Sequence, residues 1–146
     1  MLFTPDQLIA HAVGDYVLQS DWMANEKTKK SVAALAHVVT YTLPFLFLTQ
    51  NWRALLIIAG SHFIIDRWRL ARYVCWLKNF LQPPTVEVTQ TPYGDHDEWT
   101  WNHPWSECSG TGYHQDRPAW LAVWLMIITD NLMHVSINAL ALRYFP

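Results

Sequence analysis

The hydrophobic pattern divides the chain into four apolar segments with polar connections between them, at 4–20, 31–52, 53–81 and 118–144. The first opens with Thr4, Pro5 and Asp6, which suit an N-cap, the first helical position and the first turn of a helix. The second contains no Asp, Glu, Lys or Arg and reaches the ~20 residues that a helix needs to cross a bilayer. The third is apolar as far as Ile65 and amphipathic beyond it, and the fourth has Asp130 as its one acidic residue. The pattern therefore predicts four helices.

A long polar stretch, 82–116, separates the last two apolar segments. It begins near the pair Pro83 and Pro84 and is rich in Thr, Gly and Trp, a composition typical of loops. We therefore predict an all-α fold in which residues 1–146 form a single membrane-embedded domain. This domain is expected to be a four-helix transmembrane bundle with an irregular, Trp-rich loop at 82–116.

Composition favours a membrane setting for this bundle. Hydrophobic residues make up 51% of the chain and charged residues only 15%, against about 25% in an average soluble domain. The formal net charge of -2, without a basic run, gives no electrostatic basis for nucleic-acid binding, and the two cysteines form no C-x-x-C pair. A soluble four-helix bundle is the alternative, because three of the segments contain ionisable residues and the mean hydropathy is only +0.02.

The basic residues predict the topology. They are concentrated in two of the connections, at Lys27, Lys29 and Lys30 and at Arg67, Arg69, Arg72, Lys78 and Arg117. Connections rich in Lys and Arg stay on the cytoplasmic side of a membrane. We therefore expect a multi-pass protein of the inner membrane, with connections 21–30 and 82–116 in the cytoplasm and both termini outside.

Three of the apolar segments carry a histidine and an aspartate four residues apart, at His11/Asp15, His62/Asp66 and Asp130/His134. Residues at i and i+4 share one face of a helix, so each pair presents an imidazole and a carboxylate side by side. His37 adds a fourth imidazole from the remaining segment. Helical bundles build metal sites from such inward-facing side chains. The three pairs are therefore predicted to bind one or two divalent ions of zinc, manganese or iron.

The same pairs also suit two roles that need no metal ion. Ionisable side chains within a membrane are costly and usually functional, but an Asp–His hydrogen bond within each helix would reduce that cost and hold the bundle together. Alternatively, the imidazoles and carboxylates would serve as a proton relay. His37 taken alone is more often a hydrogen-bonded core residue than a ligand, and within the site it is a candidate ligand or general base.

The basic side chains beside one pair suggest a reaction. Arg67 and Arg69 directly follow Asp66, where they would hold an anionic group near a metal, although anchoring to lipid headgroups accounts for them equally well. The sequence is thus compatible with a metal-dependent hydrolase that acts on a small anionic, phosphorylated or lipid-like substrate near the cytoplasmic face.

Two non-hydrolytic functions remain as alternatives. One is a proton-coupled transporter or relay component. The other is a membrane interaction protein that contacts membrane lipid, another copy of itself or a protein partner through Trp99, Trp101 and Trp105.

The long loop carries further possible ligands, at His96, His103, Cys108 and His114. They are enough donors for a second metal ion, but their spacing matches no standard zinc pattern.

Three stretches resemble a known family, namely "LIAHAVGDYVLQSDWMA", "SHFIIDRWR" and "RPAWLAVWLMIITDNLMHVSINALAL". The first contains the motif His-x-x-Gly-Asp. The family is a group of small polytopic membrane proteins of bacteria and phages, catalogued as a domain of unknown function. The resemblance spans 5–81 and 117–142, and the long loop departs from the shorter family pattern. It implies a membrane location and supports the set of histidines and aspartates, and it gives no activity. A fainter similarity to inner-membrane metal-dependent hydrolases, whose helices also carry histidines near the bilayer, is one of fold-level analogy.

Overall fold

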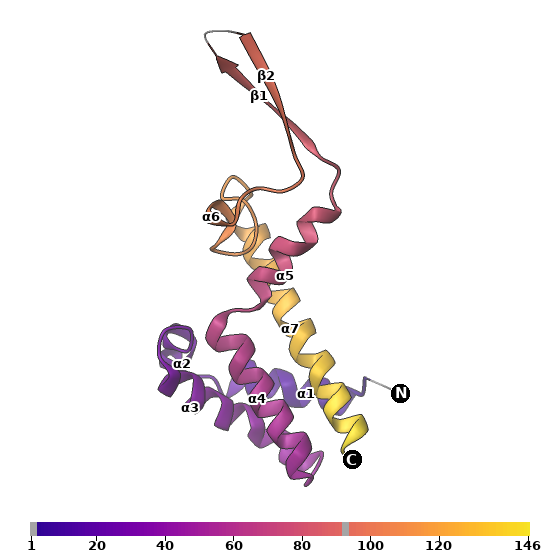
Figure 1. Cartoon of the computed structure of the whole chain (residues 1–146). Coiled ribbons are helices and arrows are strands. Elements are labelled where there is room, and N and C mark those ends of the chain that lie inside the picture. The colour runs from indigo at the N-terminus through magenta and orange to yellow at the C-terminus, as the bar shows by residue number, and fades with distance from the viewer. Residues whose placement is uncertain (1–2, 92–93) are drawn as a thin grey trace. The chain divides into compact units, whose positions relative to one another are not determined.

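A computed structural model describes residues 3–91 and 94–146 of the chain (Figure 1). These residues form two compact units. The first comprises the chain as far as Leu70 together with Asp130–Pro146, and the second comprises Ala71–Thr129. The described chain is mostly helical, which confirms the helical character of the prediction.

The first unit is built from short helices and the C-terminal part of one long helix. Its elements are α1 (Pro5–Ala12), the π-helix η1 (Val13–Val17), α2 (Asp21–Glu26), α3 (Ser31–Thr42), the 3-10 helix η2 (Leu43–Phe47), α4 (Trp52–Trp68) and the end of α7 (Ala119–Tyr144). Thr4, Ser20 and Asn51 cap the starts of α1, α2 and α4, because each side-chain oxygen accepts a backbone N–H of the first turn. Helices α3 and α4 lie next to each other (Figure 1).

Each predicted segment of this unit is more divided than the hydrophobic pattern indicates. The 4–20 segment changes from α-helix to π-helix at Val13, and the 31–52 segment tightens into 3-10 helix at Leu43, directly before Pro44. The 53–81 segment breaks at Arg69, which adopts a left-handed conformation with φ 50° and ends α4. The prediction of one continuous helix is therefore wrong for the 53–81 segment, whereas in the other two segments the helix continues and changes type.

The second unit contains α5 (Ala71–Lys78), the 3-10 helix η3 (Asn79–Leu81), strands β1 (Thr85–Thr91) and β2 (Gly94–Thr100), α6 (Trp105–Cys108) and the start of α7. The two strands form an antiparallel hairpin in which Thr85 lies opposite Thr100. The 82–116 stretch is therefore not irregular throughout, because it contains this pair of strands.

Helix α7 is the one helix among the described residues that is long and apolar enough to cross a membrane. Ser31–Phe47 is also apolar but shorter. The fourth apolar segment thus matches a membrane span by length and composition, whereas four spans are not shown.

A close approach between η1 and α3 fixes how these two elements pack. A Cβ added to Gly14 would lie 2.6 Å from Cδ2 and 2.9 Å from the carbonyl oxygen of Tyr41, which is fully buried. Only glycine therefore fits at this crossing without displacing the backbone of α3.

We expect Gly14→Ala to lower the free energy of unfolding by about 1–3 kcal/mol, because the added methyl group overpacks the crossing. Thermal unfolding followed by circular dichroism in detergent measures the change. Gly60→Ala is the matched control, since an added Cβ there meets no atom of the described chain within 4 Å. Alanine also has the better helix propensity, so this control should be neutral or stabilising. Equal melting temperatures for the two variants would contradict the role of the close approach.

Candidate metal centre

The first unit brings together most of the predicted histidines and aspartates. His11 lies on α1, Asp15 on η1 and His37 on α3, while His62 and Asp66 lie on α4. The α7 residues of the set are His134 and Asp130. All of these side chains are buried except that of Asp130, which is 29% exposed.

Four of these side chains converge on one point and are called the inner cluster, namely Asp15, His37, His62 and Asp66. The His37 and His62 Nε2 atoms are 2.9 Å apart. Asp15 Oδ1 lies 3.2 and 3.3 Å from these two nitrogens, and Asp66 Oδ2 lies 3.2 and 3.1 Å from them. Elements η1, α3 and α4 thus contribute one nitrogen pair and one oxygen pair.

Two overlapping groups of side chains here are close enough to share an ion, namely Asp15, His37 and His62, and His62, Asp66 and His134. Ligand atoms at ~2.0–2.1 Å from a metal are about 3.3–3.4 Å apart in a tetrahedron and about 2.8–3.0 Å apart in an octahedron. The nitrogen–nitrogen distance of 2.9 Å lies in the octahedral range, one nitrogen–oxygen distance of 3.3 Å lies in the tetrahedral range, and the other distances of 3.1 to 3.2 Å lie between the two ranges. Two imidazoles and two carboxylates also form a donor set that suits zinc, manganese or iron.

The hydrogen bonding within the inner cluster is incomplete. Asp15 Oδ1 and Asp66 Oδ2 are buried, and no contact of theirs within the described chain has hydrogen-bond geometry. The Nδ1 atoms of His37 and His62 are also buried, without a hydrogen-bond partner among the described residues. A buried carboxylate oxygen that accepts no hydrogen bond requires compensation by a nearby positive charge.

Lys27 supplies part of that charge. From the sequence, this lysine predicts only the membrane topology. Its Nζ lies 2.8 Å from Asp66 Oδ2 and 3.3 Å from His37 Nε2, with the side chain 18% exposed. The neighbouring Lys29 and Lys30 pair instead with Glu26, and the hydrogen bond from Lys30 lowers the pKa of that carboxyl below its ordinary value. No sequence signal distinguishes the three lysines, since only the turn after α2 directs one of them inward.

His134 extends the inner cluster on the side of α7. Its Nε2 lies 3.3 Å from Asp66 Oδ1 and 3.4 Å from Asp130 Oδ2. His62, Asp66 and His134 are also close enough to share an ion. Asp66 therefore faces two possible positions for a cation, one through each carboxylate oxygen.

His11 differs from the other predicted ligands because neutral groups satisfy both of its ring nitrogens. Its Nε2 lies 2.8 Å from Asn131 Oδ1, which only accepts, so Nε2 donates. In the neutral ring Nδ1 then accepts from the Tyr41 hydroxyl at 2.9 Å, and Asn138 Nδ2 donates to that hydroxyl at 2.6 Å. The sequence pattern did not single out these three partners, although each is a polar residue within an apolar segment.

His11 still lies near the inner cluster, since its Nδ1 is 3.5 Å from Asp15 Oδ2. A hydrogen-bonded imidazole of this kind orients a neighbouring carboxylate. His11 is therefore better placed beside a ligand than as one.

Arg67 holds the connection that carries Lys27. Its guanidinium donates to the backbone oxygens of Thr28 and Lys29, at 2.6 and 3.2 Å, and to Ser31 Oγ at 3.3 Å. Arg69 ends α4 in its left-handed conformation. The anion-binding role predicted for both arginines stays a prediction.

Comparison with known proteins identifies one similarity. Residues 2–90 match the model of a family described as "Protein of unknown function (DUF3307)". No curated protein and no solved structure matches the chain. The matched part contains the whole inner cluster and Lys27, whereas Asp130 and His134 lie beyond it.

We expect Lys27→Met to destabilise the metal-free protein by about 3 kcal/mol, because it leaves Asp66 buried without its closest cation. Chemical unfolding of chelator-treated protein in detergent measures the loss. Lys29→Met is the matched control, since the exposed Lys29 ammonium pairs with Glu26 at 3.4 Å and its loss should change stability by less than about 1 kcal/mol. Equal stability of the two variants would show that Lys27 does not balance the inner cluster.

Proposed function

The chain belongs to the DUF3307 family of proteins of unknown function, and we propose that it is an integral membrane protein with a divalent metal centre in its helical bundle. The centre serves hydrolysis of a phosphorylated or lipid-like substrate. The observation that carries the proposal is the approach of two buried carboxylate oxygens to the same two imidazole nitrogens, at nitrogen–oxygen separations of 3.1 to 3.3 Å.

The distribution of polarity in the first unit supports the membrane location. Val32, Val39, Phe47 and Leu56 are 60 to 91% exposed, whereas the histidines are buried. An apolar groove of about 380 Å³ also opens between α3 and α4. An extensive apolar surface around a polar interior is unfavourable in water. The same arrangement is favourable in lipid, where the apolar side chains contact the hydrocarbon. We place the protein in the inner membrane as a multi-pass protein, with 21–30 and 82–116 cytoplasmic and both termini outside.

Each residue of the centre has a distinct role in the proposal. The inner cluster would hold the first ion, and His62, Asp66 and His134 would form a position for a second ion, with Asp130 beside His134. A divalent ion supplies Lewis acidity toward a phosphoryl or carbonyl oxygen and acidifies water. With an ion in the inner cluster, charge repulsion would displace the Lys27 ammonium from Asp66 Oδ2. Its partly exposed side chain allows this movement.

Two alternatives differ from the metal centre in what balances the carboxylates. Lys27 already contacts Asp66, which favours a purely structural ion-pair cluster. The directed chain from Asn138 through Tyr41 and His11 to Asn131 favours a polar relay. The metal centre is favoured because two carboxylate oxygens approach the same two imidazole nitrogens.

The metal content of the purified protein tests the proposal. We expect one or two tightly bound ions of zinc, manganese or iron per chain, measured by elemental analysis after a mild chelator wash in detergent. His62→Ala should lose at least one ion, because His62 belongs to both possible positions. Ser61→Ala is the matched control on the same helix. A wild-type protein that is folded and metal-free would overturn the metal centre.

The hydrolase is tested separately with the metal-loaded protein. We expect phosphate release from a lipid phosphomonoester in mixed micelles, and a loss of at least about 100-fold in Asp66→Asn. Protein that retains its metal but releases no phosphate from lipid or soluble phosphomonoesters would leave the metal centre and overturn the proposed reaction.

A further inference from the structure

A second group of metal-ligating side chains lies in the second unit, at His103, Glu107 and His114. His103 directly precedes Pro104, the N-cap of α6, Glu107 lies on α6, and His114 lies in the connection to α7. His114 Nε2 is 3.1 Å and His103 Nδ1 is 3.9 Å from Glu107 Oε2. One ligand atom from each residue lies within 4.8 Å of the others. One carboxylate oxygen thus faces two imidazoles.

Helix α5 and the adjoining η3 hold the two chain segments that carry the histidines. The Trp76 indole donates to the His103 backbone oxygen at 3.0 Å, and the Trp76 backbone oxygen accepts from Asn102 Nδ2 at 2.9 Å. On the other side, Asn79 Nδ2 donates to the Gly112 backbone oxygen at 3.1 Å. These bonds fix the backbone near each imidazole without using an imidazole nitrogen, so the group is positioned by its scaffold.

The imidazoles are also aligned with each other. The rings of His103 and His114 stack with their centroids 4.0 Å apart and their planes at 24°. Their side chains are 25 and 15% exposed, and that of Glu107 is 44% exposed. The group is therefore partly shielded and still reachable from solvent.

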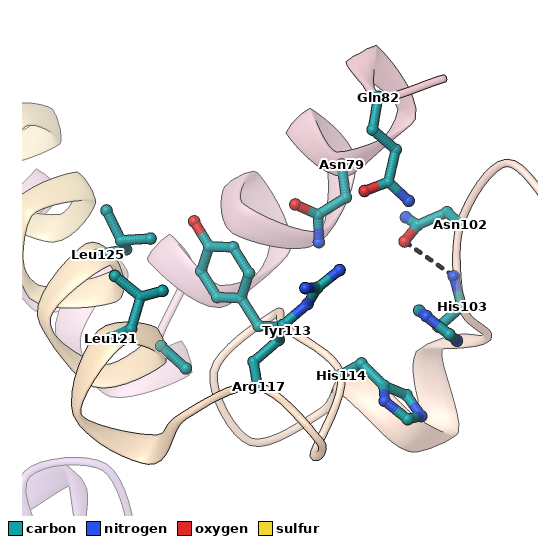
Figure 2. A pocket seen from close by; sticks show the side chains of 10 residues that line it. Asn79, Gln82, Asn102, His103, Tyr113, His114, Arg117, Leu121 and Leu125 are labelled. Carbon is teal, nitrogen blue, oxygen red and sulfur yellow. Dashed lines mark hydrogen bonds between the residues drawn. The ribbon is translucent and has the colours of Figure 1, made fainter. Parts of the chain in front are cut away.

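A pocket of about 250 Å³ adjoins the two histidines. Figure 2 shows the imidazoles at one end of this pocket and the side chains of Leu121 and Leu125 at the other. The Arg117 guanidinium lies between these ends. The pocket thus combines a possible metal position, a positive charge and an apolar wall.

We propose that His103 Nδ1, Glu107 Oε2 and His114 Nε2 form a second divalent metal site, independent of the buried centre. Two imidazoles and one carboxylate are the protein ligands of many open zinc sites, in which the fourth position takes water or a ligand. Here that position adjoins the pocket, where Arg117 would accompany an anionic ligand group. The imidazole content favours zinc over magnesium.

The proposed ligands differ from the donors predicted from the loop sequence, because Glu107 takes the place of Cys108 and His96. Cys108 is fully buried, whereas its neighbour Glu107 contacts both histidines. His96 lies on β2, and its side chain is outside the described part of the structure. The mixed spacing of His103, Glu107 and His114 is the reason that no standard zinc pattern is visible.

Zinc titration of the chelator-treated full chain in detergent, by isothermal calorimetry, tests the second site. We expect a zinc equivalent that persists in His62→Ala, where the buried centre is disrupted. His114→Ala and Glu107→Gln should each weaken that equivalent at least about tenfold. Asp116→Asn is the control, since Asp116 is 84% exposed and contacts the other nitrogen of His114, at 3.3 Å. It should change the affinity by less than about threefold.

Three outcomes would overturn the second site. One is that folded His62→Ala protein binds no zinc, while the zinc titration of Glu107→Gln is the same as that of the wild-type chain. Another is an equal loss in Asp116→Asn and Glu107→Gln, which would indicate general attraction to acidic side chains. The third is magnesium binding of the same affinity. Circular dichroism checks the fold of each variant, and Glu107→Gln keeps the test valid if His114→Ala does not fold.

Discussion

The first unit depends on keeping two buried carboxylates, those of Asp15 and Asp66, in the company of positive charge. Their side chains are only 10 and 4% exposed, so water does little to solvate them. The free-energy cost of burying an isolated ionised carboxylate there is larger than the stabilisation from any single packing contact. The helices must therefore deliver imidazoles and an ammonium to the same point. This electrostatic demand determines which helix faces meet, and the small apolar core around Phe45 and Ile58 adds to it.

Polar groups in this unit form two shells with different chemistry. The inner shell is ionisable and incompletely hydrogen-bonded, which leaves it free to accept a cation. The outer shell is neutral and hydrogen-bonded, as in the bond from Gln7 Nε2 to the Val135 backbone oxygen at 2.7 Å. A rigid neutral frame around a charged, unsatisfied centre is the arrangement by which proteins preorganise ligands before an ion arrives.

The parts of this arrangement that depend on local spacing could be predicted from the sequence. The i,i+4 pairs, the cap at Thr4 and the long apolar helix near the C-terminus all follow from periodicity. Lys27 could not be predicted, since its inward direction results from a turn after α2 and from contacts with residues far along the chain. The change of helix type at Val13 and the break at Arg69 depend on packing, and the neutral partners of His11 come from α3 and α7. The pairs predict that polar groups gather, and only the fold selects which of them face one another.

The π-helical turn at Val13–Val17 has a consequence for how the protein tolerates change. Such a turn contains one residue more than the α-helical turn it replaces, and it closes here through the bond from the Leu18 N–H to the Val13 oxygen at 3.0 Å. A regular α-helix advances by about 100° per residue, so loss of one residue from this turn would rotate Asp15 by roughly that angle relative to the rest of the helix. The carboxylate would then point away from α3 and α4. Length, as well as composition, is thus constrained in this stretch, and shortening it would preserve a helix and dismantle the centre.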